Sequence, residues 1–373
     1  MHKKELLDLY SDYLLASFGA TTATGFSQLL EGQVSHDQVT RSLSGPQQTA
    51  VDLWRQVKPL ARQIQSDEIQ SDAAVLIIDD SIEEKPYTDE NEIVCWHYDH
   101  SKDQQVKGIN FLSALYHSQE VSLPVGFELI AKTEFYLDSK TGQEKRRSPV
   151  TKNEYCRELI EQAVKNQLPF RFVLFGCPLG RVWFSSADNM KFIKQEQERD
   201  FVCPLKTNRK VAVSREDKAQ GRYQRVDTLE RVDTLEIEAK ATAEIYLEGV
   251  EFPLRLAKQL FANEDGSTGL VYLVCSDTTT NFDQITTNYH KRWQVECYHK
   301  SLKQNVSLAK SPTQTRTTQT NHFFAALCGF IKLEQLKIKT KLNHFALKSR
   351  LYINALQSAF DTLRQLTLPQ AAA

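Results

Sequence analysis

The chain has 373 residues, of which 41% are hydrophobic and 25% charged, and its formal net charge at pH 7 is −1. These values are typical of a globular protein with material for one large domain or two to three smaller ones. No apolar run approaches the ~18 residues that a membrane span needs, and the N-terminus offers no signal-peptide core. Seven scattered cysteines without a CxxC pair favour reduced thiols, so we expect a cytoplasmic protein.

Residues 1–70 are predicted to form a helical N-terminal region, because apolar side chains recur at helical spacing. Two short helices are expected over residues 24–30 and 35–43, joined by a glycine-containing turn. Ser35 is a good N-cap for the second helix, and Gln38, three residues later, completes a capping box.

These two short helices look like a helix-turn-helix, a motif that binds DNA through its second helix. The side chains that this helix would present to DNA include Gln38, Thr40 and Arg41. The same pattern fits a helical hairpin that packs only against a protein core, and the residues alone do not decide between the two interpretations.

Residues 71–199 alternate between strands and helices. Strands are predicted at 73–78, 93–98, 106–116, 122–130 and 170–175. Helices are predicted at 151–166, where Thr151 opens a capping box, and at 187–198. The first strand ends in the pair Asp79-Asp80. Strands followed by helix, strand and helix, with an acidic residue at the end of the first strand, are the order of an RNase H-like fold. We therefore expect an α/β protein whose catalytic core begins here.

Residues 200–280 are polar and rich in strand-forming sequence, most clearly at 241–250 and 270–274, and are predicted to be a β-rich insertion. The hexapeptide Arg225–Glu230 is repeated at once as 231–236. Such a duplication is too short for a structural repeat and is expected to extend a loop. The last part of the core is predicted at 281–306.

Residues 307–373 are predicted to form a basic helical C-terminal region, with an exposed Thr/Gln/Ser-rich linker at 307–320 and helices at 322–339 and 345–366. Residues 301–350 hold nine Lys or Arg and one acid, a local charge of +8 that leaves −9 for the remainder. Residues 66–99 show the opposite bias, with eleven acids and one Lys. This asymmetry favours an enzyme of phosphodiesters, with chance clustering on solvated faces as the alternative. The candidate DNA contacts in the basic block are Lys337, Lys339 and Lys341.

The most informative motif contains Tyr289, Arg292, Glu296 and Lys303, at offsets 0, 3, 7 and 14. On one continuous helix these side chains would lie within about 60° of one another. A carboxylate flanked by two cations and a phenol suits a metal ligand that also meets phosphate. A solvated helix with i,i+4 ion pairs, such as Arg292 with Glu296, explains the same spacing.

This spacing is similar to the YREK signature around the last acidic residue of bacterial insertion-sequence transposases with a DDE active site. The segments 75–81, 183–193 and 343–349 resemble the same family, so the resemblance runs from about residue 6 to about residue 363. It implies an RNase H-like catalytic core that binds Mg²⁺ or Mn²⁺ through Asp79 and Glu296. It assigns supporting roles to Tyr289, Arg292 and Lys303. Asp80 is the alternative to Asp79, because neighbouring strand residues point to opposite faces.

The resemblance also implies a function. The protein would act on double-stranded DNA in the bacterial cytoplasm, at the nucleoid. It would bind the terminal inverted repeats of its element as a homodimer, cut the DNA ends and join them to a target. Two metal ions held by carboxylates are the usual means of such chemistry.

The second acidic residue of the family pattern is missing from its expected place. The family has a strand, then Asp, one residue and Trp-Phe, whereas residues 172–175 are followed by Gly176-Cys-Pro-Leu-Gly-Arg-Val182 before Trp183. Counted from the end of the strand, Gly176 stands where the Asp is expected; counted back from Trp183, Arg181 stands there. Asp188 is the nearest carboxylate that could replace the lost ligand. We therefore expect this chain to be impaired in catalysis, and a DNA-binding derivative without cleavage and a metal-dependent nuclease are the alternative functions.

A zinc site is a competing hypothesis, since Cys95, His97 and Asp99 alternate on one face of a predicted strand. Ligands on a single strand cannot close a tetrahedron, so strand packing is the preferred interpretation.

Overall fold

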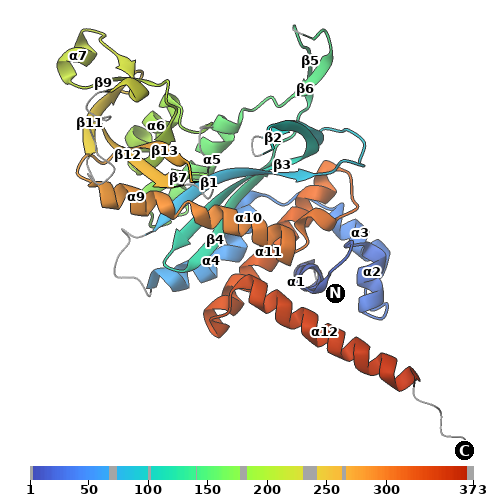
Figure 1. Ribbon diagram of the computed structural model, residues 1–373. Helices are drawn as coiled ribbons and strands as arrows, with labels where there is room; N and C mark the ends of the chain where they lie inside the picture. The colour runs from blue at the N-terminus through green and yellow to red at the C-terminus, as the bar shows by residue number, and fades with distance from the viewer. Residues whose placement is uncertain are drawn as a thin grey trace, which may run out of the picture. The chain divides into compact units, whose positions relative to one another are not determined.

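The computed structural model describes residues 3–66, 74–99, 102–139, 141–176, 183–229, 242–262 and 266–367. The chain divides into two compact units, which are described separately (Figure 1). The larger unit is Thr49–Tyr298, and the smaller one combines Met1–Gln48 with His299–Ala373. The helical segment predicted over residues 1–70 is thus divided between the units, and the predicted last part of the core crosses the boundary within one helix.

The larger unit is built on a mixed sheet whose order is β10-β9-β11-β12-β13-β8-β7-β1-β3-β2, with β4 also paired to β3. Its strands are β1 (Val75–Glu84), β2 (Val94–Asp99), β3 (Gln104–Ser118), β4 (Val121–Leu129), β7 (Phe172–Phe175), β8 (Asp200–Leu205), β9 (Lys210–Ala212), β10 (Gln224–Arg225), β11 (Thr242–Leu247), β12 (Leu254–Ala262) and β13 (Thr268–Cys275). A separate hairpin, β5 (Glu134–Leu137) with β6 (Glu144–Arg147), projects from this sheet (Figure 1).

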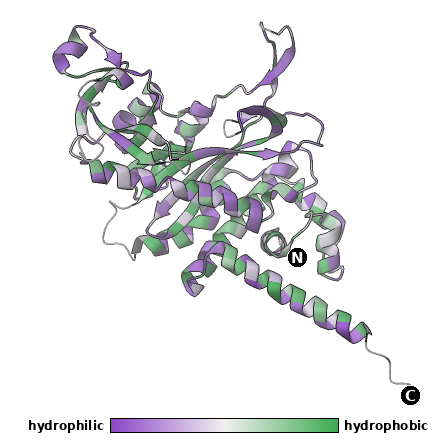
Figure 2. Ribbon diagram, viewed as in Figure 1, coloured by the Kyte–Doolittle hydropathy of each residue, from purple (hydrophilic) through white to green (hydrophobic). Residues whose placement is uncertain are grey.

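The centre of the sheet has the strand arrangement of an RNase H-like core. Strand β3 runs antiparallel to β1, β2 and β4, whereas β7 runs parallel to β1 and β8 parallel to β7. Residues Val75–Ile78 and Phe172–Phe175 are buried throughout, as expected of parallel strands covered on both faces. Figure 2 shows the hydrophobic colour on the central strands of the sheet. The predicted fold class is therefore confirmed.

In the sequence, strands β9 to β13 lie between β8 and helix α9 (Phe282–His290). Each pairs antiparallel with its neighbours, and β13 joins the set to β8 through the register Cys275↔Val202. This is the place at which the β-rich insertion was expected. The second copy of the duplicated hexapeptide lies outside the described residues.

The helices of the larger unit are α4 (Ala50–Ser66), α5 (Lys152–Lys165), α6 (Ala187–Lys191), α7 (Arg215–Ala219) and α9 (Phe282–His290), together with the first part of α10 (Trp293–Asn305). The predicted Thr151 capping box opens α5, with both hydrogen bonds present. The helix predicted at 187–198 is α6 followed by a π-helical turn over Phe192–Glu196.

The smaller unit is helical and contains α1 (Lys3–Ala16), α2 (Ala23–Leu29), α3 (His36–Leu43), α11 (Arg316–Thr340), α12 (His344–Thr367) and the end of α10. The capping box of Ser35 and Gln38 is present at the start of α3. No helix in the described parts of the chain is long and apolar enough to cross a membrane.

The predicted exposed linker at 307–320 is wrong, because α11 already begins at Arg316 and Gln319 is completely buried. The polar composition misled the interpretation, since these side chains form hydrogen bonds inside the unit. Ser307 Oγ donates to the Leu14 carbonyl at 3.0 Å, and the Asn321 amide joins Leu43 and Gln48 through bonds of 2.8 Å each.

Candidate active site

Asp79 lies where the parallel pairing of β1 stops, although it does not end the strand. The register Ile78↔Phe175 is the last pair between β1 and β7, while β1 continues to Glu84 against β3. The prediction that Asp79-Asp80 terminates the first strand is therefore wrong, because the antiparallel ladder extends past it. Asp79 nevertheless stands at the carboxyl edge of the neighbouring strand β7, which is the usual place for ligand-binding groups in an open α/β sheet.

Gly176 follows β7 at this edge and packs directly against the Asp79 carboxyl group. Its N–H donates to the Ile78 carbonyl at 2.8 Å. A Cβ atom on residue 176 would lie 2.2 Å from Asp79 Cγ and 2.5 Å from Asp79 Oδ1. Any side chain at this position would force Asp79 to move, so Asp79 in its present position depends on glycine here.

Asp80 points to a different set of partners. Its Oδ2 accepts hydrogen bonds from Asn110 Nδ2 at 2.8 Å and from Lys152 Nζ at 2.6 Å. This ion pair occupies Asp80, which makes Asp79 the better metal-ligand candidate. Lys152 was missed by sequence reasoning, and its only signal was its place at the first position of the helix that Thr151 caps.

The segment that carries Tyr289, Arg292 and Glu296 is not one continuous helix. Helix α9 ends at His290 and α10 begins at Trp293, and the turn between them is closed by i→i−3 bonds, such as Arg292 N–H to Tyr289 O at 3.0 Å. The predicted shared helix face is therefore wrong in its geometry. The break still places the Arg292 guanidinium 5.5 Å from the centre of the Tyr289 ring and 2.6 Å from Glu296 Oε1.

The electrostatics bring Asp79 and Glu296 into one group. Burial is the main cause that raises the pKa of Asp79 well above its ordinary value, the negative charges of Asp80 and Glu296 raise it further, and Arg292 opposes them. The charge of Glu296, 217 positions away in the sequence, thus acts on Asp79.

The donor set fits one hard divalent cation but not a pair. Asp79 and Glu296 supply carboxylate oxygens, and Mg²⁺ is commonly held by one or two carboxylates together with substrate phosphates. In the described parts of the chain, no group of three or more His, Cys, Asp or Glu could hold a metal ion. Gly176 supplies no side-chain oxygen at the edge where a third ligand was expected.

Asp188 does not join this group. It lies in the first turn of α6, its side chain is 79% exposed, and its ion-pair partner is Lys191 at 3.4 Å. Stabilisation of the helix N-terminus accounts for an acid at this place. Lys303 lies two turns beyond Glu296 on α10, in the part of that helix that belongs to the smaller unit. Residues 177–182, including Arg181, lie outside the described residues.

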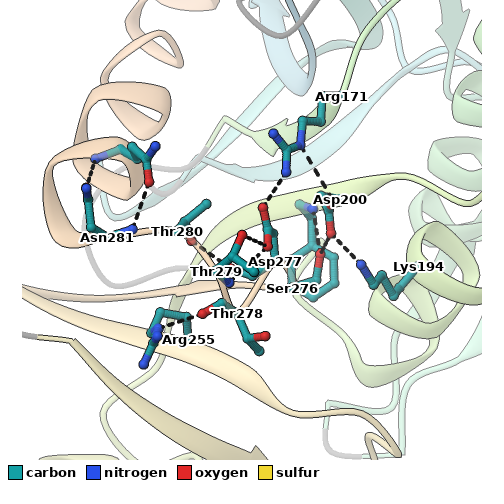
Figure 3. Close-up of polar contacts among 12 residues, drawn as sticks. Arg171, Lys194, Asp200, Arg255, Ser276, Asp277, Thr278, Thr279, Thr280 and Asn281 are labelled. Carbon is teal, nitrogen blue, oxygen red and sulfur yellow. Dashed lines mark hydrogen bonds and ion pairs between the residues drawn. The ribbon is translucent and has the colours of Figure 1, made fainter.

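A second polar cluster lies at the opposite ends of β7 and β8 (Figure 3). Arg171 precedes β7, Asp200 begins β8, and Asp277 follows β13. Arg171 pairs with Asp277 and lies 3.9 Å from Asp200, which also binds Lys194 at 2.7 Å. Although burial opposes the change, hydrogen bonds from Thr279 and the charge of Arg171 hold the pKa of Asp277 below its ordinary value.

This cluster holds in place the loop between β13 and α9, the helix that precedes the segment with Glu296. Thr279 N–H and Oγ1–H both donate to Asp277 Oδ1, at 3.0 and 2.7 Å, and Asn281 caps α9 (Figure 3). Two acids and two bases balance one another, so the cluster is suited to stabilising the fold.

The pattern of buried and exposed side chains on α3 fits both a DNA-binding helix-turn-helix and a helical hairpin that packs only against the protein core. Val39 and Leu43 of α3 are buried, whereas Gln38, Thr40 and Arg41 are exposed. Gln38 is also used in the capping box, because its Oε1 accepts from the Ser35 N–H at 2.8 Å.

Several cations of the basic block are already engaged inside the smaller unit. Lys310 binds the Phe18 carbonyl, Lys332 binds Asp8 and Asp12, Lys337 binds Glu334, and Lys348 binds the Leu15 and Ser17 carbonyls. Glu334 is 2% exposed, so its partner Lys337 is needed within the protein. Lys339, Lys341 and Arg350 are exposed and remain as phosphate-contact candidates.

Among the residues that the structure describes, no ligand set for zinc is present around Cys95 and His97. Cys95 and His97 are buried in β2, and burial is the main cause that lowers the pKa of His97 to about 3. Both side chains are part of the strand packing.

Two protein families match the chain, over ranges of residues that overlap. The profile of the DDE superfamily endonuclease family matches residues 1–241, and that of the transposase DDE domain matches residues 183–330. Among solved structures, the crystal structure of an endonuclease V from Bacillus subtilis aligns at 12% identity over 65% of this chain and 92% of its own, with a TM-score of 0.25. No curated protein matches the chain.

Proposed function

Because the chain belongs to the DDE superfamily endonuclease family, we propose that it is the transposase of a bacterial insertion sequence. In this proposal it binds the terminal inverted repeats of its element, and its metal-dependent cleavage and strand transfer are impaired. The observation that supports the proposal is the position of Asp79 at the edge of the sheet where β7 ends in Gly176, within the electrostatic influence of Arg292 and Glu296.

Asp79 and Glu296 would hold a divalent cation, Mg²⁺ or Mn²⁺. When bound, such an ion activates a water or a 3′-hydroxyl and stabilises charge at the phosphorus. Arg292 holds Glu296 by its ion pair, and its guanidinium suits contact with a DNA phosphate. Tyr289 supports Arg292 from the other side of the turn, and Lys303 supplies a further cation along α10.

Glycine at residue 176 explains the proposed impairment. A site for two metal ions needs carboxylates that bridge and flank both, and the position at the end of β7 offers none. A ligand at residue 176 would also require Asp79 to shift from its present position against Gly176. Binding of DNA does not require this ligand, so recognition of the element ends is expected to persist, with the protein acting as a homodimer on DNA.

The test compares Mg²⁺-dependent cleavage of DNA that bears the element ends by two chains. One is the natural chain, and in the other residues 176–182 are replaced by Asp and one apolar residue, which restores the family spacing to Trp183. The restored chain should cleave at least ~10²-fold faster, since charge stabilisation of this kind contributes several kcal/mol. Gly176→Ala is the matched control, because it displaces Asp79 without adding a ligand. Equal rates for the natural and restored chains would contradict the proposed impairment, and absence of binding to the element ends would contradict the proposed function.

A further inference from the structure

The hairpin of β5 and β6 is a two-stranded ribbon that stands apart from the main sheet of the larger unit (Figure 1). In the described part of the chain, no third strand pairs with it. All four residues of β5 are exposed, and the exposed fractions of Phe135, Tyr136 and Leu137 are 53%, 38% and 72%. Large apolar side chains gathered on an exposed element indicate a surface that meets a partner.

The turn of the hairpin is closed by hydrogen bonds around Asp138. The Asp138 N–H donates to the Gln143 carbonyl at 2.9 Å, and the Gly142 N–H donates to the Asp138 carbonyl at 2.8 Å. The Thr141 N–H donates to Asp138 Oδ1 at 3.0 Å. Gly142 has a φ of +66°, a conformation that glycine adopts without strain. The ribbon therefore has a defined shape before any partner binds.

The two faces of the ribbon carry different side chains, because opposite residues of an antiparallel pair share a face and successive residues alternate. One face consists of Phe135, Leu137, Glu144 and Arg146, and the other of Glu134, Tyr136, Lys145 and Arg147. On the first face, the Arg146 guanidinium lies 4.3 Å from the centre of the Phe135 ring and 3.6 Å from the carboxylate of Glu90, which precedes β2. This face thus ties the ribbon to the rest of the unit.

The second face, called the Tyr136 face, carries two exposed cations beside an aromatic ring. The side chains of Lys145 and Arg147 are 42% and 63% exposed, and the Arg147 guanidinium lies 5.8 Å from the centre of the Tyr136 ring. The acidic partners of the two cations are Asp138 and Glu134, on the same hairpin. Exposed ion pairs contribute little to stability, so a phosphate can replace either carboxylate at small cost.

The charge and the dimensions of the ribbon fit duplex DNA. Residues 132–147 contain five Lys or Arg and three acids, a net charge of +2 in a chain whose net charge is −1. Strands of four residues span about 13 Å and lie about 5 Å apart, and the major groove of B-DNA, about 12 Å wide, admits a two-stranded ribbon. Arg and Lys bind guanine O6 and N7 in that groove, as well as phosphate.

We propose that the ribbon of β5 and β6 enters the major groove of duplex DNA, with the Tyr136 face toward the bases and Lys145 and Arg147 bound to guanine or phosphate. The inference rests on the proposed function and deepens it, because it names an element of the larger unit that contacts the substrate. This contact is separate from the candidates on α3 and in the basic block.

The test compares the natural chain with the ribbon variant, in which Lys145→Gln and Arg147→Gln are combined. The control combines Arg55→Gln with Lys165→Gln, which removes two exposed, ion-paired cations from the same unit. Binding to DNA that bears the element ends is measured over a range of salt concentrations. Dimethyl sulfate footprinting at saturating protein reports guanine N7 atoms, which lie in the major groove.

The ribbon variant should bind roughly tenfold or more weakly, and its log–log salt slope should fall by about 0.9 for each phosphate contact that is lost. Some guanines that the natural chain and the control protect should become reactive in the ribbon variant. Circular dichroism of each variant reports folding. Should the ribbon variant fail to fold, Tyr136→Ala must still expose these guanines for the inference to stand.

Unchanged guanine protection in the ribbon variant would overturn the inference, whatever its affinity, and would leave the proposed function intact. An equal loss of protection in the control would overturn it as well, because the effect would then follow from total charge. If the ribbon variant loses protection on every duplex alike and the natural chain shows no preference for the element ends, the inference stands and the proposed recognition of those ends fails. A natural chain that binds no duplex DNA would contradict both.

Discussion

The two polar clusters of the larger unit lie at opposite ends of the same strands and differ in charge balance. At the end of β7, Asp79 lies against Gly176 and among the charges of Asp80 and Glu296, and its pKa is raised. At the start of β7 and β8, Asp277 is matched by Arg171 and by hydrogen bonds from Thr279, and its pKa is lowered.

The two carboxylates thus have opposite effects on the fold: ionised Asp79 destabilises it and ionised Asp277 stabilises it. A raised pKa means that ionised Asp79 is less stable in the folded protein than in the unfolded chain, which is typical of a group retained for binding. A lowered pKa means that ionised Asp277 stabilises the fold.

The largest effect is expected at Asp79 and Glu296 in the restored chain, where residues 176–182 are replaced by Asp and one apolar residue. Asp79→Asn or Glu296→Gln should each lower Mg²⁺-dependent cleavage by roughly 10²–10³-fold, since each removes a candidate metal ligand. The measurement is the single-turnover rate on DNA that bears the element ends. Asp188→Asn is the matched control and should leave that rate unchanged.

Asp277→Asn should destabilise the larger unit by about 1–3 kcal/mol, because Arg171 loses the closer of its two acidic partners and keeps only Asp200 at 3.9 Å. The free energy of unfolding from urea titration measures this cost. Because folding lowers the pKa of Asp277, its contribution is present above the unfolded-state pKa and is lost as pH falls through the folded-state pKa. The gap between the natural chain and the variant should therefore narrow in acid, and a constant gap would argue against the ion pair as its cause.

Asp79→Asn should have the opposite sign and stabilise the protein by roughly 0.5–2 kcal/mol at neutral pH. Folding raises the pKa of Asp79, so its ionisation makes the natural chain less stable as pH rises from the unfolded-state pKa to the folded-state pKa. The advantage of the variant should grow with pH over that interval. A loss of stability at neutral pH would show that Asp79 supports the fold instead of straining it.

The smallest effect concerns the basic block. Replacing Lys339 and Lys341 with Gln should weaken binding to all DNA sequences alike and reduce the log–log salt slope by about 0.9 for each phosphate that is no longer neutralised. Lys337 is left intact, because its removal would leave Glu334 buried without that partner. An unchanged slope would show that these lysines do not bind phosphate.

The sequence predicted the succession of strands and helices along the core, because the apolar runs of β1 and β7 and the capping box at Thr151 are local signals. The YREK-like spacing likewise pointed to Arg292 and Glu296, since an i,i+4 pair survives a change in the preceding turn. The break between α9 and α10 could not be read from the sequence, because no Pro or Gly marks it.

Contacts between residues that lie far apart in the sequence could not be predicted from the sequence. The pair of Lys152 with Asp80 joins residues 72 positions apart, and the fit of Gly176 against Asp79 depends on the parallel register of β1 and β7. The buried polar residues around Gln319 were misjudged for the same reason, since their hydrogen-bond partners come from the other end of the chain.

The number of metal ions that the site holds tests the central claim most directly. Titration of Mn²⁺ into the natural chain, the restored chain and their Asp79→Asn variants, followed by electron paramagnetic resonance, counts the bound ions. We expect one weakly bound ion in the natural chain, a second in the restored chain, and loss of both in the Asp79→Asn variants. Two ions bound to the natural chain with the affinity of the restored one would contradict the claim that glycine at residue 176 leaves the site incomplete.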